Sequence, residues 1–189
     1  EKKLREYIAI AALFGCTFLR FVIDGPGYEP EIPEIISVIR KALPDLRKNR
    51  LVLALENHDR LKTYEFLELI EKTDPEWAGI CLDSVNSMGA AEGIREVVSS
   101  LAPYTVNLHI KDFIIRRASH KMGFITEGVP AGQGMLNINW LIGQIKQHGR
   151  CNSAILELWT PPEKELEATL KKESQWADES IKYLKNLFT

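Results

Sequence analysis

The sequence has few cysteines, no excess of charge of either sign and no long hydrophobic run. Its 189 residues include 3 cysteines, an odd number with no C-x-x-C spacing, so neither a disulfide framework nor a cysteine-based metal site is indicated. The 24 basic and 26 acidic side chains leave a formal net charge of −2, and lysine and arginine form no blocks. This balance argues against a nucleic-acid partner, because a surface that binds nucleic acid has to neutralise phosphates.

Membrane association is not indicated either. No apolar stretch approaches the roughly 18 residues of a transmembrane helix, and the segment from Glu1 to Arg5 lacks the apolar centre of a signal peptide, so we expect a cytoplasmic protein. A chain of this length, with 45% hydrophobic residues, can form a core without disulfides. We therefore interpret residues 1–189 as a single domain with buried thiols. Because the chain opens on Glu1 in a helical pattern, we interpret it as a piece of a longer protein.

Helical and strand patterns alternate along the chain. The predicted strands are continuously apolar, and helices of about 10 to 15 residues separate them, which is typical of βαβ units and of a parallel sheet covered by helices. The fold class is therefore α/β. Five strands fit either a doubly wound sheet or an incomplete (β/α)8 barrel, because a complete barrel takes about 250 residues. The predicted strands cover residues 17–23, 51–56, 79–83, 105–110 and 153–158.

Single residues predict several helix boundaries. Pro33 is suited to the first turn of a helix that Pro44 is expected to disturb, because proline lacks the N–H that the helix interior requires. Thr63 and Asn137 are expected to cap the helices that follow them.

Four of the five predicted strands end in a residue type that binds metals. Since the carboxyl ends of parallel strands meet at one face of the sheet, we expect these four side chains to converge. Taken one at a time, each is equally explained as a polar residue where a strand meets its loop. Together, uncompensated buried carboxylates would repel one another, which favours a bound cation. The four residues are Glu56, Asp83, His109 and Glu157.

Three carboxylates and one imidazole form an oxygen-rich donor set. Such a set suits Mn²⁺, Mg²⁺ or Co²⁺ and leaves coordination positions open for substrate oxygens. Zn²⁺ is less natural than it is at a site of cysteine and histidine.

The four strand ends, read as Leu-Glu-Asn-His, Leu-Asp-Ser-Val-Asn-Ser, Leu-His-Ile-Lys-Asp-Phe and Leu-Glu-Leu-Trp, resemble the xylose isomerase-like barrels. These sugar phosphate isomerases/epimerases include the ketose 3-epimerases and the endonuclease IV type of DNA-repair enzyme. The resemblance covers nearly the whole chain and implies a (β/α)8 TIM barrel that is incomplete here, with the first two βα units missing. An edge strand would then be exposed, and pairing with another copy in a homo-oligomer or a missing segment would cover it.

The resemblance also implies roles for the four strand-end residues. Glu56, Asp83, His109 and Glu157 would bind one divalent ion of the Mn²⁺ type, with Mg²⁺, Co²⁺ or Zn²⁺ as alternatives. Glu56 and Glu157 would in addition be the catalytic acid/base groups on opposite faces of a small carbohydrate. Polarisation of a ketone by the ion acidifies the neighbouring C–H, so a carboxylate can generate a metal-stabilised enediolate.

One motif departs from the family pattern. Many ketose epimerases and the endonuclease group carry Asp-x-x-His at the strand that matches Asp83, whereas this chain has Asn86 in place of the histidine. The additional histidines of a trinuclear metal cluster are also missing, which argues against DNA cleavage.

Six further residues are candidates for substrate binding. Lys111 would face inward with His109 if the strand continues, and Arg116 belongs to a long, glycine-rich segment, residues 112–136, that we expect to act as a cationic lid. The alternatives are a surface lysine and a solvated hairpin. Asp112 is a candidate to hydrogen-bond His109 from behind. The substrate-binding candidates are Arg20, His58, Asn86, Lys111, Arg116 and Trp159.

Three functions remain open at this point. The first is a divalent-metal-dependent isomerase or epimerase of a small sugar, ketose or sugar acid. The second is a lyase on the same site, either a decarboxylase of a 3-oxo sugar acid or a dehydratase, because both reactions pass through a similar enolate. The third is an inactive truncated fragment or binding module.

Overall fold

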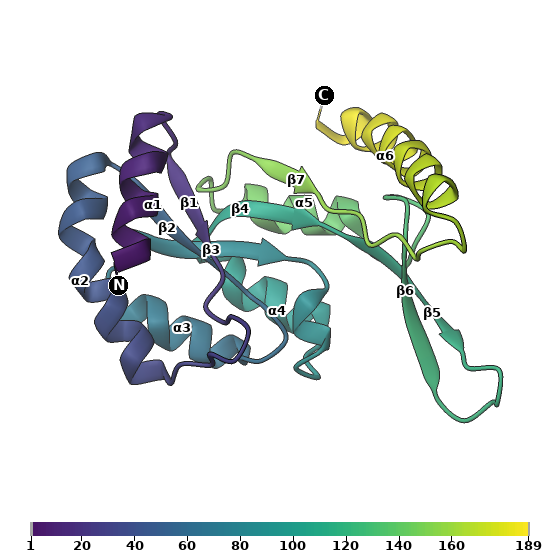
Figure 1. Cartoon of the computed structure of the whole chain (residues 1–189), viewed down its shortest axis with the longest axis horizontal. Coiled ribbons are helices and arrows are strands. Elements are labelled where there is room, and N and C mark those ends of the chain that lie inside the picture. Colours follow the sequence, from purple (N-terminus) through teal and green to yellow (C-terminus); the bar gives the residue numbers. More distant parts are fainter. Residues whose placement is uncertain (1, 189) are drawn as a thin grey trace. The chain divides into compact units, whose positions relative to one another are not determined.

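The computed structural model describes residues 2–188. Backbone contacts divide the chain into two compact units. The first unit runs to Leu108 and includes Gln144–Ser153, and the second holds His109–Gly143 and the chain from Ala154 onward. Figure 1 shows the elements of both units along the sequence.

The main sheet has its five strands in the order β1-β2-β3-β4-β7. Strands β1, β2 and β3 pair in parallel. Because the order follows the sequence without reversing, the sheet is part of a (β/α)8 barrel and not a doubly wound sheet. All five predicted strands are present, and the expected α/β barrel type is confirmed. The strands are β1 (Phe18–Phe21), β2 (Val52–Glu56), β3 (Ala78–Asp83), β4 (Thr105–Ile110) and β7 (Ala154–Leu156).

The central strands are buried along their whole length. Every residue of β3 and β4 is buried, as are the last four residues of β2. Strands covered on both faces read as continuous apolar runs, which is why the sequence pattern located them.

Four helices of the first unit pack side by side in a row, α1 on α2, α2 on α3 and α3 on α4 (Figure 1). Each of these helices buries apolar side chains, for example Leu4, Ile8 and Ala11 of α1. The helices are α1 (Lys2–Leu13), α2 (Ile32–Asn49), α3 (Thr63–Glu71) and α4 (Ile94–Leu101), and two 3-10 helices, η1 (Asn86–Met88) and η2 (Ala102–Tyr104), follow β3 and α4.

The expectation that Pro44 would disturb its helix was wrong. Helix α2 continues through Pro44 and ends at Asn49, where Arg50 adopts a left-handed conformation. The buried side chains of Leu43 and Leu46 flank the proline. Burial of each is worth about 1.5–3 kcal/mol, which together outweighs the cost of about 3 kcal/mol for an interior proline.

The N-terminus of α3 also differs from the expectation. Thr63 is the first helical residue and not the cap. The Glu92 carboxylate, far away in sequence, accepts hydrogen bonds from both the Thr63 backbone N–H and the Thr63 hydroxyl, at 2.9 Å each. At α5 (Ile138–Lys146) the predicted cap is confirmed, because the Asn137 side chain accepts from the Trp140 N–H at 3.0 Å.

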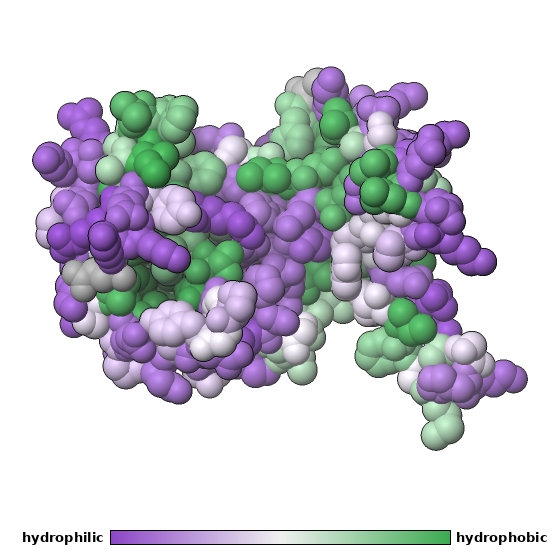
Figure 2. Space-filling model, in the orientation of Figure 1, coloured by the Kyte–Doolittle hydropathy of each residue, from purple (hydrophilic) through white to green (hydrophobic). Residues whose placement is uncertain are grey.

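The segment predicted as a lid loop is mostly an antiparallel hairpin. Strand β5 (Asp112–Arg117) pairs with β6 (Phe124–Val129), with Asp112 opposite Val129. Its apolar side chains are widely exposed, including Met122 and Phe124, and Figure 2 shows hydrophobic surface over the hairpin at the lower right. The closing helix α6 (Leu166–Phe188) begins ten residues earlier than its apolar stripe from Trp176 indicated.

The expectations for the cysteines and for membrane-spanning helices concern separate parts of the structure. The cysteines are all free, but only Cys81 is buried, since Cys16 is exposed and Cys151 is half-buried. Within residues 2–188, none of the helices combines the length and apolarity that crossing a membrane would require.

Candidate metal centre

The four predicted metal ligands sit at the carboxyl ends of their strands. Glu56 and Asp83 are the last residues of β2 and β3, and each is 1% exposed. His109 is the last residue but one of β4 and is 4% exposed. Glu157 follows β7 directly and is half-buried. Each side chain therefore lies where the strand pattern placed it.

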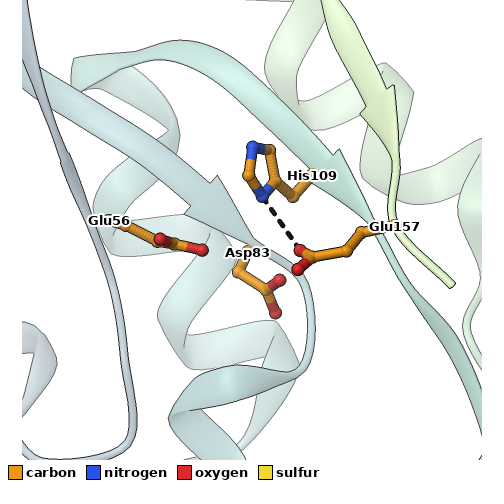
Figure 3. A group of neighbouring side chains, drawn as sticks. All are labelled: Glu56, Asp83, His109 and Glu157. Carbon is orange, nitrogen blue, oxygen red and sulfur yellow. Dashed lines mark hydrogen bonds and ion pairs between the residues drawn. The ribbon is translucent and has the colours of Figure 1, made fainter. Parts of the chain in front are cut away.

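The structure brings all four residues together. One ligand atom from each of Glu56, Asp83, His109 and Glu157 lies within 4.8 Å of every other (Figure 3). Ligands bound at about 2.0–2.6 Å from a common ion are separated by about 3–5 Å, so these separations suit one divalent cation. Three carboxylates and one imidazole also supply the charge and donor types that such a cation requires.

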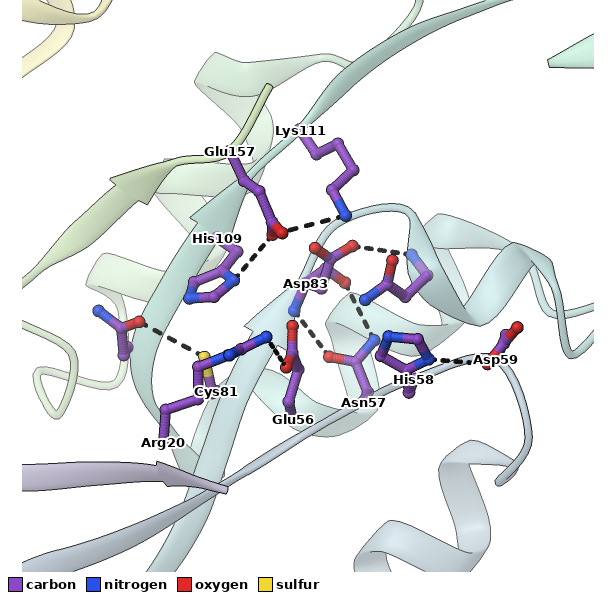
Figure 4. A network of polar contacts seen from close by, with 12 residues as sticks. Arg20, Glu56, Asn57, His58, Asp59, Cys81, Asp83, His109, Lys111 and Glu157 are labelled. Carbon is purple, nitrogen blue, oxygen red and sulfur yellow. Dashed lines mark hydrogen bonds and ion pairs between the residues drawn. The ribbon is translucent and has the colours of Figure 1, made fainter. Parts of the chain in front are cut away.

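Glu56 is paired with a cation from the neighbouring strand. The Arg20 guanidinium of β1 forms an ion pair with the Glu56 carboxylate, which is almost completely buried (Figure 4). In the parallel register Arg20 lies opposite Ala54, two residues before Glu56, so the Arg20 and Glu56 side chains leave the same face of the sheet near the strand ends. Arg20 is itself about half exposed, so its guanidinium also faces solvent.

Asp83 is held by several hydrogen bonds. Its Oδ1 accepts from the backbone N–H groups of Val85 and Asn86, both at 2.8 Å. The Asn57 side chain binds the Asp83 backbone, accepting from its N–H at 2.7 Å and donating to its carbonyl at 3.0 Å (Figure 4). Sequence reasoning missed Asn57, although its place directly after a strand-end ligand was a usable signal.

His109 and Glu157 contact each other within the second unit. His109 Nδ1 lies 3.0 Å from Glu157 Oε2, and Lys111 Nζ lies 3.5 Å from the same oxygen (Figure 4). The Glu157 backbone N–H donates to the Ile110 carbonyl at 3.0 Å, which fixes Glu157 beside the end of β4. The Lys111 side chain is only 13% exposed, so its ammonium is held close to the ligands.

The other predicted substrate contacts occupy different surroundings. His58 is exposed and hydrogen-bonds Asp59 at 2.7 Å, which holds the pKa of the Asp59 carboxyl below its usual value. Asn86 is half-buried and contributes its backbone N–H to Asp83. Trp159 is 46% exposed, and its backbone packs so tightly on Gly128 of the hairpin that a Cβ there would lie 2.0 Å from the Trp159 carbonyl oxygen.

Arg116 lies on the exposed hairpin and forms a bidentate pair with Glu127 across it, with both bonds at 2.7 Å. This pair raises the pKa of Arg116 and lowers that of Glu127. The guanidinium that we expected to meet substrate is thus engaged within the hairpin.

Asp112 has a different role from the one expected. Instead of supporting His109, its buried carboxylate accepts four backbone hydrogen bonds, from Phe113, Gly132, Gly134 and Leu136, at 2.8–3.1 Å. Asp112 therefore joins the base of the hairpin to the glycine-rich turn that follows it.

A family model for the xylose isomerase-like TIM barrel matches residues 2–187. The chain belongs to this family. Its relative 3-oxo-isoapionate decarboxylase of Pectobacterium atrosepticum is 32% identical over 181 residues, which cover 96% of this chain and 66% of that protein. The chain thus spans just under two thirds of the length of this relative.

Several solved structures share the fold at low sequence identity. An L-ribulose 3-epimerase matches with a TM-score of 0.69 and 13% identity, covering 98% of this chain and 66% of that one. A xylose isomerase-like TIM barrel protein from Mycobacterium smegmatis, in complex with magnesium, matches with a TM-score of 0.68 and 16% identity, covering 93% and 65%. At these identities the likeness establishes the barrel fold.

Proposed function

We propose that this chain carries the metal centre of a sugar-processing enzyme that decarboxylates a small 3-oxo sugar acid. The observation that supports it is the group of four ligands within 4.8 Å, with the cationic side chains of Arg20 and Lys111 each beside one of its carboxylates. An oxygen-rich cation site flanked by an arginine and a lysine favours a substrate that is both an oxygen chelator and an anion.

Glu56, Asp83, His109 and Glu157 would hold the divalent cation. When bound, the cation would polarise the ketone of the substrate and stabilise the negative charge that develops there. Arg20 guanidinium and Lys111 ammonium would bind and orient the substrate anion, because both can donate several charge-assisted hydrogen bonds.

The reaction balances without an oxidant or a reductant. The bond between the carboxylate carbon and its neighbour breaks, CO₂ leaves, and the electron pair moves toward the ketone oxygen. A proton then adds to the carbon that lost the carboxylate. The 32% identical decarboxylase supports this assignment, although this chain spans only 66% of that protein.

An epimerase or isomerase is the second candidate. Glu56 ends β2 and Glu157 follows β7, so these two carboxylates of the group would be available to remove a proton from one face of a sugar and return it to the other. The likeness to an L-ribulose 3-epimerase is compatible with this reaction.

The first experiment measures the metal content of the purified chain by plasma mass spectrometry after incubation with Mn²⁺ and gel filtration. We expect about one ion per chain, and less than a tenth of that in Asp83→Asn and His109→Ala. Asp59→Asn removes an exposed carboxylate outside the group and serves as the matched control. Equal metal content in the wild type and all three variants would contradict the site and would favour a binding module.

The second experiment separates the two reactions. The manganese-loaded chain is incubated with 3-oxo sugar acids and with ketoses in D₂O, and released CO₂ and deuterium incorporation are both measured. Release of CO₂ with one deuterium in the product supports a decarboxylase. Deuterium exchange into recovered ketose without CO₂ would establish the epimerase or isomerase instead.

A further inference from the structure

The residue directly after β2, Asn57, is a buried amide whose side-chain hydrogen bonds lead to the end of β3 and to η1. We propose that Asn57 is a positioning residue that fixes Asp83 relative to Glu56 and thereby sets the affinity of the centre for its cation. This inference rests on the proposed metal centre. It assigns a role to a residue that does not itself belong to the ligand group.

The Asn57 side chain continues the hydrogen bonding between β2 and β3 beyond their last paired residues. The last paired residues of β2 and β3 are Glu56 and Cys81, so the Asp83 peptide lies beyond the ladder. The Asn57 carboxamide takes the place of a partner peptide, because it accepts from the Asp83 N–H at 2.7 Å and donates to the Asp83 carbonyl at 3.0 Å. An amide is the side chain that can offer both an acceptor and a donor to one peptide group.

The same amide also fixes the turn that holds the Asp83 carboxylate. Asn57 Nδ2 donates to Ser87 Oγ at 2.9 Å, and Ser87 belongs to η1. The residues before Ser87, Val85 and Asn86, donate their N–H groups to Asp83 Oδ1. Both the backbone and one carboxylate oxygen of Asp83 are therefore fixed by a network that includes Asn57, the residue directly after Glu56.

The network leaves little room for adjustment. Asn57 is completely buried, and Ser87 is 4% exposed. Close by, a Cβ at Gly89 would lie 2.6 Å from the Asp59 Cβ, so the segments after β2 and β3 are packed in direct contact. Loss of the Asn57 amide would leave the buried N–H and carbonyl of Asp83 without these hydrogen bonds. The Asp83 backbone would then shift toward other partners, and its carboxylate would move with it.

Metal affinity is sensitive to such shifts. Removal of groups that orient metal ligands typically weakens binding about 10–100-fold, although these groups never touch the ion. The test titrates the chain with Co²⁺ and follows its visible absorption, which reports both the affinity and the coordination geometry. We expect Asn57→Ala to weaken Co²⁺ binding about 10–100-fold and to change the shape of the visible band.

Asn107 of β4 provides a matched control. It is also a completely buried amide with three hydrogen-bond contacts, donating to the Ser153 hydroxyl and carbonyl and accepting from the Cys81 thiol. Asn107→Ala should lower the thermal midpoint about as much as Asn57→Ala but leave the Co²⁺ affinity within about threefold. Asn57→Ser, which keeps one hydroxyl, should give an intermediate affinity and remains informative if Asn57→Ala does not fold.

The outcomes separate the inference from the proposed function. Weakening by the two Asn57 variants but not by Asn107→Ala supports the positioning role. Wild-type Co²⁺ binding that survives Asn57→Ala, or that falls equally in Asn107→Ala, overturns the role while leaving the metal centre intact. Absence of Co²⁺ binding by the wild type overturns the proposed metal centre itself and the inference with it.

Discussion

The glycine-rich turn after the hairpin requires glycine at position 134. The Asp112 carboxylate lies so close to Gly134 that a Cβ there would be 2.1 Å from Asp112 Oδ1 and 2.5 Å from the Phe113 carbonyl oxygen. Only a residue without a side chain allows its N–H to reach the carboxylate at 2.9 Å. The turn thus needs glycine for close approach.

Substitution of two glycines by alanine should therefore have opposite effects. Gly134→Ala should lower the free energy of unfolding by about 2–4 kcal/mol, because it creates a steric clash and disrupts bonds to a buried carboxylate. Gly143 lies inside α5 with nothing within 4 Å of its Cβ position, so Gly143→Ala should raise stability by about 0.5–1 kcal/mol. Urea unfolding of both variants checks this, and destabilisation by both would contradict the assigned packing.

The convergence of the four candidate ligands was predictable from sequence, whereas the residues that contact them were not. Glu56, Asp83 and His109 end continuous apolar runs, and parallel strands bring such ends together. The pairing of Arg20 with Glu56 and the hydrogen bonds of Asn57 to Asp83 depend on the register between strands, and the place of Asn57 directly after Glu56 was the local signal for the second of these. The expectation that Asp112 supports His109 was wrong, because the hydrogen bonds of the Asp112 carboxylate lead to a turn about twenty residues away.

At the scale of elements, burial in one case and strand pairing in another overrode the local preferences. Pro44 and the glycines of residues 112–136 indicated a helix end and a loop. Helix α2 nevertheless continues, because its apolar stripe is buried on both sides of the proline. Residues 112–117 and 124–129 pair as β5 and β6 although much of their apolar surface is exposed. Charged and glycine residues in this segment made its strand pattern hard to recognise in the sequence.

The connection between α2 and the start of β3 is stabilised by an ion pair that titrates at low pH. The Arg47 guanidinium lowers the pKa of Asp74, and a hydrogen bond from the Glu76 N–H adds to this. Since the folded-state pKa lies below the unfolded-state value of about 4, the pair stabilises the fold above that pH. The stabilisation is lost as pH falls through the lowered pKa.

Asp74→Asn should thus destabilise the chain by about 1 kcal/mol at pH 7, and the difference from wild type should shrink toward zero as pH falls from about 4 to 2. Asp178→Asn, at an exposed position in α6, is the control and should show little difference at either pH. Chemical denaturation across this pH range provides the measurement. A difference that stays constant with pH would mean that Asp74 acts through its neutral hydrogen bonds alone.

At the scale of the whole molecule, the proposed centre couples cation binding to stability. Three carboxylates gathered within 4.8 Å repel one another when no cation is bound, and a bound cation reverses this term. The folded chain alone presents the ligands together, so a cation that binds it shifts the unfolding equilibrium by mass action. At a concentration of 100 times Kd, the gain is about 2.7 kcal/mol.

Thermal unfolding with and without Mn²⁺ should show this coupling in the wild type and little of it in a variant that lacks one of the four carboxylate or imidazole groups. For the wild type we expect the midpoint to rise by about 5–10 °C at saturating Mn²⁺ and to return on addition of EDTA. Asp83→Asn retains an oxygen that can accept from the Val85 and Asn86 N–H groups but removes one negative charge. Its midpoint without metal should therefore equal or exceed that of the wild type, and Mn²⁺ should raise it by less than 2 °C, roughly the lower end of the shift for 1 kcal/mol in a domain of this size. An equal rise in both proteins would mean that Mn²⁺ stabilises the chain from somewhere other than these strand ends.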